Sequence, residues 1–261
     1  MHGRERFHLN GTISHTGGPP VAVFKKSGLC AMKVNQCMIV FVKYPTPGEV
    51  KTRLAATTGN EFAMSLYRLF VADTLDMLGS TTSDVVIACD PQGTPEQYSA
   101  WLGNGRNYFR QTGSGVGERM ANAFTQAFST GYSRVLLMGS DIPDLPAEVL
   151  GQAFSALSNS DAVIGPSTDG GYYLIGFNKG AFTDEVFRNI AWSTPAVLKD
   201  TCARLDAHHR STHILLPWSD VDTRADLQAL YERNRNTLFA KSRTMRYLDL
   251  HEEVIDGEIE L

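Results

Sequence analysis

Cysteine is scarce and scattered in this 261-residue chain, and no two cysteines form a C-x-x-C pair. Cys30, Cys37, Cys89 and Cys202 therefore lack the spacing that is typical of a structural zinc site. Isolated cysteines of this kind are usually reduced thiols, as in cytosolic proteins.

Long apolar runs are also missing. No stretch approaches the roughly 20 residues that a membrane-spanning helix needs, and the N-terminal sequence MHGRERFHLNGTISHTGG has no apolar signal-peptide segment. We therefore expect a cytoplasmic protein without a membrane span.

Neither sign of charge dominates the chain. The net charge is -4 and the isoelectric point is near 6.0, which gives no electrostatic reason to expect nucleic acid as a partner. The fractions of hydrophobic residues, 43%, and charged residues, 20%, are those of an ordinary soluble globular protein. A small anionic ligand in a local basic pocket is compatible with these numbers.

Strand and helix patterns alternate between residues 36 and 232. This alternation indicates parallel βαβ units, whose ligands lie beyond the carboxyl ends of the strands. We predict a catalytic domain over 36–232, a disordered N-terminal extension over 1–35 and a C-terminal tail of unassigned structure over 233–261. Strands are expected at 38–42, 84–89, 107–111, 134–138, 162–165, 172–177 and 213–216, and the clearest helices at 60–78, 144–157 and 224–232.

The first strand runs into a loop and a helix with the sequence MIVFVKYPTPGEVKTRL, in which Pro47 and Gly48 stop regular structure. Lys51 and Arg53 lie just at the start of the helix, where cations oppose the helix dipole unless an anion is present. We interpret both as ligands of a phosphate in a nucleotide-binding loop. For Lys43 two roles remain open, that of a phosphate ligand and that of a solvated surface side chain. A P-loop is excluded because its second glycine is absent.

A glycine cluster, GSGVG at 113–117, precedes another helix. It resembles a dinucleotide fingerprint only loosely, because that motif should follow the first strand of its unit. Gly115 belongs either to a backbone cradle for the nucleotide or to a plain turn. Glu118 and Arg119 either line the site or simply begin the helix.

Several aspartates follow the expected strands. Asp141 comes directly after the strand at 134–138, where a carboxylate can share Mg²⁺ or Mn²⁺ with phosphates, whereas a turn or cap role fits Asp144 better. A second carboxylate for the metal could come from Asp222 or, as the weaker alternative, from Asp220.

Two further patterns concern neighbouring loops. Thr223 and Asp226 form a capping box for the helix at 224–232, which leaves the carboxylates before it available. Asp169 is followed by two glycines and is either a general base or substrate anchor, or a simple Asp-Gly turn. Trp192 is interpreted as a packing residue.

Taken together, six sequence blocks in this order resemble one known family. They are FVKYPTPGEVKTRL (41–54), GVGERM (115–120), GSDIPDL (139–145), GPSTDGGYYLIG (165–176), WST (192–194) and DVDT (220–223). The chain is similar to the bacterial GT-A-type proteins of unknown function that are often named nucleotide-diphospho-sugar transferases, some of them arsenosugar-biosynthesis glycosyltransferases.

The resemblance implies an α/β fold of the Rossmann-like GT-A type, with a mostly parallel central sheet and helices on both faces. It also implies that Asp141 is a metal ligand and that the first loop binds the nucleotide. More distant relatives in fold are guanylyltransferases that act on phospholactate and on the molybdenum cofactor. Tyr172 departs from the small polar residue that those guanylyltransferases tend to carry after D-G-G, which weakens a nucleotidyltransferase interpretation.

The sequence thus predicts a metal-dependent glycosyltransferase that moves a sugar from a nucleotide-diphosphate sugar to a small acceptor. Lys51 and Arg53, with Mg²⁺ or Mn²⁺ on Asp141 and Asp222, would stabilise the charge on the departing diphosphate. Asp169 would orient or deprotonate the acceptor hydroxyl. The alternative is nucleotidyl transfer from an NTP to a phosphorylated small molecule. The sequence does not indicate the sugar, the base, the acceptor or the oligomeric state.

Overall fold

The computed structural model describes residues 35–255 and residue 257. The predicted disordered extension therefore lies, apart from Asn35, outside the described residues. Within the described part, Cys37, Cys89 and Cys202 are free thiols, and the first two are buried.

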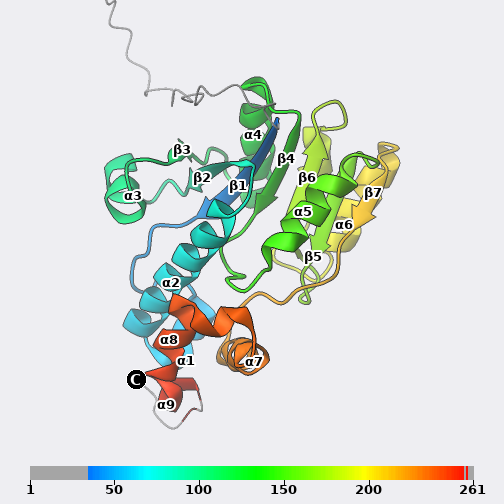
Figure 1. Ribbon diagram of the computed structural model, residues 1–261. Coiled ribbons are helices and arrows are strands. Elements are labelled where there is room, and N and C mark those ends of the chain that lie inside the picture. Colours follow the sequence, from blue (N-terminus) through cyan, green and yellow to red (C-terminus); the bar gives the residue numbers. More distant parts are fainter. Residues whose placement is uncertain (1–34, 256, 258–261) are drawn as a thin grey trace, which may run out of the picture.

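A seven-stranded sheet runs through the described residues in the order β3-β2-β1-β4-β6-β5-β7 (Figure 1). β6 is antiparallel to both of its neighbours, and the other strand pairs are parallel. The antiparallel direction follows from the short connection before β6, because a parallel crossover needs a dozen or more residues. The strands are β1 (Gln36–Val42), β2 (Asp84–Cys89), β3 (Asn107–Arg110), β4 (Arg134–Met138), β5 (Ala162–Pro166), β6 (Tyr172–Asn178) and β7 (Thr212–Ile214).

Helices cover both faces of the sheet, as predicted (Figure 1). One apolar layer joins the sheet to α2, α3 and α5, and the other joins it to α4, α6 and η1. The α-helices are α1 (Thr52–Thr58), α2 (Asn60–Gly79), α3 (Pro95–Leu102), α4 (Val116–Ser129), α5 (Ala147–Ala156), α6 (Val197–Ala207), α7 (Arg224–Asn234), α8 (Arg243–Asp249) and α9 (Glu252–Ile255), and the 3-10 helices are η1 (Asp184–Phe187) and η2 (Leu238–Lys241).

β1 explains why the sheet is buried on both sides. Its side chains alternate between the two layers, with Met38, Val40 and Val42 in one and Cys37 and Ile39 in the other. A strand with apolar residues at every position can only be satisfied between two layers of helices. The continuous apolar run in the sequence therefore predicts its central place correctly.

Residues 238–255 form short helices that pack against α1, α2 and α7 (Figure 1). α8 and α9 share a third apolar cluster with α1, α2 and α7. Asp73 on α2 accepts hydrogen bonds from the backbone N–H groups of Arg243 and Thr244, at 3.1 and 2.8 Å, and so fixes the start of α8. The C-terminal helices thus complete the core around α1, the helix that carries Arg53.

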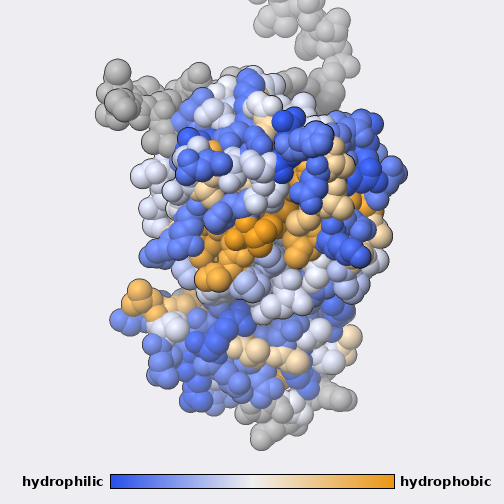
Figure 2. Space-filling model, turned by 90° about the vertical axis from the view of Figure 1, so that its right-hand side faces the viewer, coloured by the Kyte–Doolittle hydropathy of each residue, from blue (hydrophilic) through white to orange (hydrophobic). Residues whose placement is uncertain are grey.

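None of the helices in the described part has both the length and the apolar character to cross a membrane. The face of the molecule that bears β7 shows an apolar patch among mainly hydrophilic residues (Figure 2). Ile214 at the end of β7 is 48% exposed and Leu216 is 75% exposed. This edge of the sheet therefore presents apolar side chains to solvent.

Two glycines test how tightly the sheet is packed. A Cβ atom on Gly176 in β6 would overlap the buried Leu136 side chain and lie 3.0 Å from the Val135 carbonyl oxygen, whereas a Cβ on the exposed Gly151 of α5 meets no atom within 4 Å. We expect Gly176→Ala to lower the free energy of unfolding by about 1–3 kcal/mol. The control Gly151→Ala should raise it by about 0.5–1 kcal/mol, as alanine does in an open helix position. Urea unfolding measures both, and equal effects would contradict the packing described.

Candidate active site

A cavity of about 1100 Å³ lies at the edge of the sheet where the parallel strands end. The loops after β1, β2, β3 and β4 line it, together with the β5–β6 loop and residues 192–197. Because β6 is antiparallel, the loop before it reaches the same edge as the loop after β4. The cavity therefore occupies the place where open α/β sheets bind their ligands.

Lys51 lies between two of the predicted metal ligands. Its Nζ is 2.6 Å from Oδ1 of Asp141 and 3.0 Å from Oδ1 of Asp222, and its side chain is only 3% exposed. Arg53, which is largely exposed, contacts the other oxygen of Asp222. The structure thus brings together four of the residues predicted from the sequence, although they come from three separate segments of the chain.

These contacts shift the pKa values of both partners. Burial alone lowers the pKa of Lys51, but the charges of Asp141 and Asp222 outweigh it and raise the pKa above its ordinary value. Burial raises the pKa of Asp222, while Lys51 and then Arg53 lower it, with a net decrease. The ammonium and the carboxylate are therefore both charged at neutral pH.

The remaining residues predicted for the nucleotide divide into two groups. Lys43 and Arg119 line the cavity. Pro47, Gly48, Gly115 and Glu118 are not among its described lining residues. Glu118 instead accepts hydrogen bonds from the backbone N–H and the hydroxyl of Ser114, at 2.8 and 2.9 Å, and so closes the glycine-rich turn.

Arg119 is held by an aspartate that follows β2. Its Nη1 is 2.6 Å from Oδ2 of Asp90, whose side chain is 6% exposed. The backbone N–H of Gln92 donates to the other oxygen of Asp90 at 3.0 Å. Asp90 and the buried Gln111 both line the cavity, and sequence reasoning missed them, although each directly follows a strand.

Asp169 is exposed at the cavity, and its Oδ1 accepts a hydrogen bond from the N–H of Gly171 at 2.9 Å. The sequence left two roles open for Asp169. The hydrogen bond to Gly171 is that of an Asp-Gly turn, and the exposed position in the cavity is also compatible with a substrate anchor. Asp220 lies nearby and accepts a hydrogen bond from the Ser167 hydroxyl at 3.1 Å. Burial, followed by the charges of Asp222 and Asp169, raises the pKa of Asp220 to about 6.

Tyr67 on α2 connects two loops of the site through one buried hydroxyl. It accepts a hydrogen bond from the backbone N–H of Lys43 at 2.9 Å and lies 3.1 Å from the hydroxyl of Ser140. Ser140 immediately precedes Asp141 and is itself buried. The separation of the Lys43 loop from the Asp141 loop is therefore fixed by a side chain outside both.

Asp144 lies in a turn, which is one of the two roles expected for it, but it does not cap a helix, so the cap role is wrong. α5 begins at Ala147, after Pro146. The buried Asp144 carboxylate accepts hydrogen bonds from Trp218 Nε1, from Nε and Nη2 of Arg233 and from Asn234 Nδ2. Partners about 75 to 90 residues away make the side chain a tertiary link instead.

The donor set at Asp141 and Asp222 fits a divalent metal in its chemistry. Two carboxylates from different loops contact one cation, the Lys51 ammonium, and Mg²⁺ sites of this type usually combine one or two carboxylates with substrate phosphates. Within residues 35–255, no group of three or more His, Cys, Asp or Glu side chains is arranged to hold a metal alone. Water or the phosphate oxygens of a substrate would therefore supply the remaining ligands of a metal here.

Tyr172 and Trp192 form an aromatic wall at another part of the cavity, with ring centroids 6.5 Å apart in an edge-to-face arrangement. Trp192 packs against Gly117, where an added Cβ would lie 2.7 Å from Nε1 of the indole. The packing role predicted for Trp192 is thus confirmed, and the same ring also lines the cavity.

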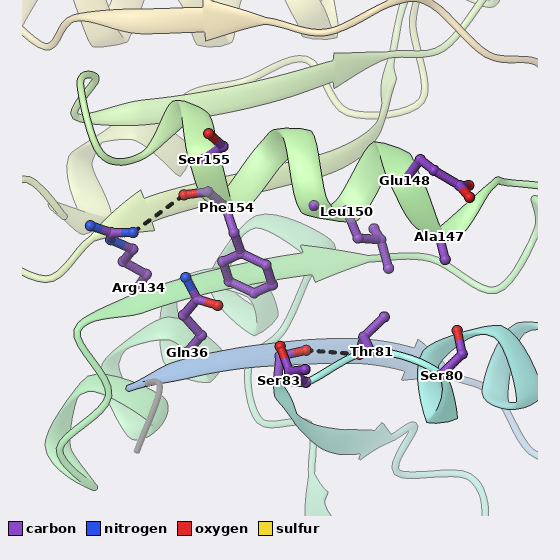
Figure 3. A pocket seen from close by; sticks show the side chains of 12 residues that line it. Gln36, Ser80, Thr81, Ser83, Arg134, Ala147, Glu148, Leu150, Phe154 and Ser155 are labelled. Atoms are coloured by element: carbon purple, nitrogen blue, oxygen red, sulfur yellow. Dashed lines mark hydrogen bonds between the residues drawn. The ribbon is translucent and has the colours of Figure 1, made fainter. Parts of the chain in front are cut away.

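A second cavity, of about 490 Å³, lies at the opposite, amino ends of β1 and β4 (Figure 3). Gln36, Arg134 and the serine- and threonine-rich turn after α2 line it, beside α5. It contains none of the residues predicted for chemistry. The candidate active site is therefore the larger cavity.

Comparison with known proteins agrees with this fold. The family model for "Uncharacterized protein conserved in bacteria (DUF2064)" matches residues 74–194. A protein of known structure from Desulfovibrio desulfuricans G20, provisionally named a nucleotide-diphospho-sugar transferase, is 44% identical with a TM-score of 0.83, and the match covers 85% of this chain and 97% of that one. The chain belongs to the DUF2064 family. No curated protein matches it.

The fold of this DUF2064 protein is also similar to more distant structures. A homologue of Mycobacterium tuberculosis Rv0371c from Mycobacterium sp. strain JC1 is 15% identical with a TM-score of 0.50, over 76% of this chain and 96% of that one. A weaker likeness, 14% identity and a TM-score of 0.46 over 76% and 97%, is to molybdopterin-guanine dinucleotide biosynthesis protein A from Archaeoglobus fulgidus. At 15% identity the first likeness shows a common fold and nothing more. The second is too weak to support a conclusion.

Removing the Tyr67 hydroxyl should disturb the site more than the fold. Tyr67→Phe leaves the Lys43 N–H and the buried Ser140 hydroxyl without this partner, which we expect to cost about 1–3 kcal/mol of stability. It should also weaken nucleotide binding in calorimetry, since the two loops lose their common link. The control Tyr132→Phe, which loses one hydrogen bond to Asp84 at the other end of the sheet, should cost stability only. Equal nucleotide affinity in the two variants would contradict the linking role.

The raised pKa of Asp220 predicts a pH-dependent stability. Because the folded state holds the proton more tightly than the unfolded state, with a pKa of about 6 against 3.8, the wild-type protein loses stability as the pH rises through this window. Asp220→Asn should therefore raise the melting temperature above about pH 7 and change it little near pH 4. The gain should be about 1 kcal/mol after allowance for partial exposure. Thermal unfolding in EDTA measures it, and a gain that is the same at both pH values would refute the assignment.

Proposed function

We propose that this protein is a metal-dependent glycosyltransferase that moves a sugar from a nucleotide-diphosphate sugar to a small acceptor. The observation that carries the proposal is the meeting of Lys51, Arg53, Asp141 and Asp222 in one cavity at the ligand edge of the sheet. Cations for a diphosphate and carboxylates for a metal are what the departure of a nucleoside diphosphate requires.

The charge balance of the cavity supports a metal. A diphosphate brings further negative charge into a space where carboxylates already outnumber cations, so added positive charge is needed for tight binding. The described lining carries the four cations Lys43, Lys51, Arg53 and Arg119 and the five carboxylates Glu49, Asp90, Asp141, Asp169 and Asp222.

Each residue has a distinct part in this scheme. Lys51 and Arg53 bind the diphosphate, and Asp141 and Asp222 hold Mg²⁺ or Mn²⁺. The metal supplies Lewis-acid stabilisation of the leaving diphosphate. Asp169, exposed in the cavity, orients the acceptor hydroxyl or takes its proton.

One feature favours glycosyl transfer over nucleotidyl transfer to a phosphorylated molecule. The β5–β6 loop and residues 192–197 contribute Asp169, Tyr172 and Trp192 to the cavity, with hydroxyls and apolar groups but no Lys or Arg. A phosphorylated acceptor would lack a cationic partner beside Asp169, whereas an uncharged hydroxyl compound fits an aromatic wall and a carboxylate. The provisional name of the Desulfovibrio protein points to the same donor class.

The metal and nucleotide site can be tested by one substitution. We expect Asp141→Asn to weaken Mn²⁺-dependent binding of nucleoside diphosphates by at least about tenfold, because even residues that support a metal ligand cost 10–100-fold when changed. The control Asp184→Asn removes an exposed carboxylate paired with Arg188 outside the cavity and should have no effect. Calorimetry over the common nucleoside diphosphates measures this, and unchanged metal-dependent binding would refute the site.

The reaction itself is identified by its released product. Incubation with nucleotide sugars or NTPs, Mn²⁺ and a panel of acceptors should release a nucleoside diphosphate if a sugar is transferred. Release of pyrophosphate from an NTP would establish the nucleotidyltransferase alternative and overturn glycosyl transfer. Asp169→Asn should lower the turnover number far more than donor affinity, which calorimetry reports separately.

A further inference from the structure

The carboxylates assigned to the metal already have a cation. Lys51 Nζ lies within 2.6 Å of Asp141 and 3.0 Å of Asp222, and its side chain is almost completely buried. The remaining oxygen of Asp222 is in contact with Arg53. The positive charge beside these two carboxylates therefore comes from the protein itself.

A divalent ion and the Lys51 ammonium compete for the same oxygen atoms. Two cations within a few ångströms repel each other strongly in a partly buried site. For the metal to bind, Lys51 has to leave both carboxylates, and a buried ammonium is costly unless it finds another anionic partner. The free protein consequently opposes metal binding at this site.

A diphosphate in the cavity provides that partner. Lys51 and Arg53 line the same cavity as the two carboxylates, so phosphate oxygens entering there can accept hydrogen bonds from the displaced ammonium. The backbone of Lys51 also has φ 49° and ψ 45°, a left-handed conformation that a residue with a side chain adopts only when surrounding contacts hold it. Whether Asp141 and Asp222 become available to a metal ion thus depends on whether Lys51 finds another anionic partner, such as a phosphate.

We propose that Lys51 determines the specificity of this site by excluding a free divalent cation and admitting one only together with a diphosphate. The inference rests on the proposed function, which makes a nucleotide diphosphate the ligand. Metal and diphosphate then bind with positive coupling, and each increases the affinity for the other by the same factor.

The first experiment needs no nucleotide. Mn²⁺ binding to the full chain is measured by electron paramagnetic resonance titration for wild type, Lys51→Met and Lys43→Met. Lys43→Met removes the same charge from the same cavity but from a residue without an ion pair to either carboxylate. We expect weak binding to wild type, at least about tenfold tighter binding to Lys51→Met, and only a small gain in Lys43→Met. A gain in Lys51→Met no larger than that in Lys43→Met would overturn the proposal.

A double variant identifies the oxygen atoms involved. The gain of Lys51→Met should disappear in Lys51→Met combined with Asp141→Asn, and a gain that persists there would overturn the assignment of the competition to this carboxylate. Thermal unfolding in EDTA checks that each variant is folded. If Lys51→Met is not folded, Lys51→Gln, which retains a polar side chain, replaces it in the same titrations.

A second experiment uses the wild-type protein and therefore holds even if no Lys51 variant folds. Methylenediphosphonate, a diphosphate analogue without a base, is titrated calorimetrically with and without Mg²⁺. Wild type should bind it at least about tenfold more tightly with Mg²⁺, and Lys51→Met should show a smaller ratio. A wild-type ratio near one would overturn the coupling.

These outcomes separate the inference from the proposed function. Failure of sugar transfer with a positive Mn²⁺ result would leave the Lys51 competition intact and remove the glycosyltransferase assignment. Transfer of sugar without a gain in Mn²⁺ affinity in Lys51→Met would retain the glycosyltransferase assignment and overturn the Lys51 competition.

Discussion

The geometry of the candidate site depends on one buried carboxylate that takes no part in the proposed chemistry. Asp144 accepts hydrogen bonds from Trp218, which precedes α7, and from Arg233 and Asn234 at the end of α7, and so joins the loop after β4 to both ends of this helix region. A buried charge is tolerated only when it is fully paired, so this link permits little relative movement. The backbone of Val221 donates to the carbonyl of Asp141 beside it, at 3.1 Å. The segments that carry Asp141 and Asp222 are thus held side by side, and both carboxylates reach Lys51.

Several carboxylates lie close together in this part of the molecule, and the stability of the fold does not require them there. Burial, and then the negative charges of Asp222 and Asp169, raise the pKa of Asp220. Lys51 pairs with Asp141 and Asp222, and its backbone has a left-handed conformation. Repulsion and backbone strain that persist at one sheet edge are typical of sites selected for binding or catalysis at some cost in stability.

What the sequence predicted well depends on local patterns. The apolar runs locate the strands, the capping box of Thr223 and Asp226 is present as predicted, and the rule that ligands bind at strand ends brings Lys51 and Asp141 into one cavity. The direct contact of Lys51 with two carboxylates, and the links made by Tyr67 and Asp144, join residues 24 to 171 positions apart. Such pairs leave no local pattern in a single sequence. A lysine, tyrosine or aspartate at these positions would look the same if its side chain were simply exposed or packed in the core.

The glycines at 113 and 117 of the glycine cluster are needed for close packing. Gly113 has φ 128°, and an added Cβ would meet the Cβ of Glu118 at 2.7 Å, so this glycine allows the turn that Glu118 closes. Gly117 faces the indole of Trp192 and the carbonyl oxygen of Phe187, at 2.7 and 2.8 Å from an added Cβ. Only glycine lets α4 approach the segment that carries Trp192, and this approach places the indole at the cavity. The cluster therefore shapes the aromatic wall that Tyr172 and Trp192 contribute to the cavity.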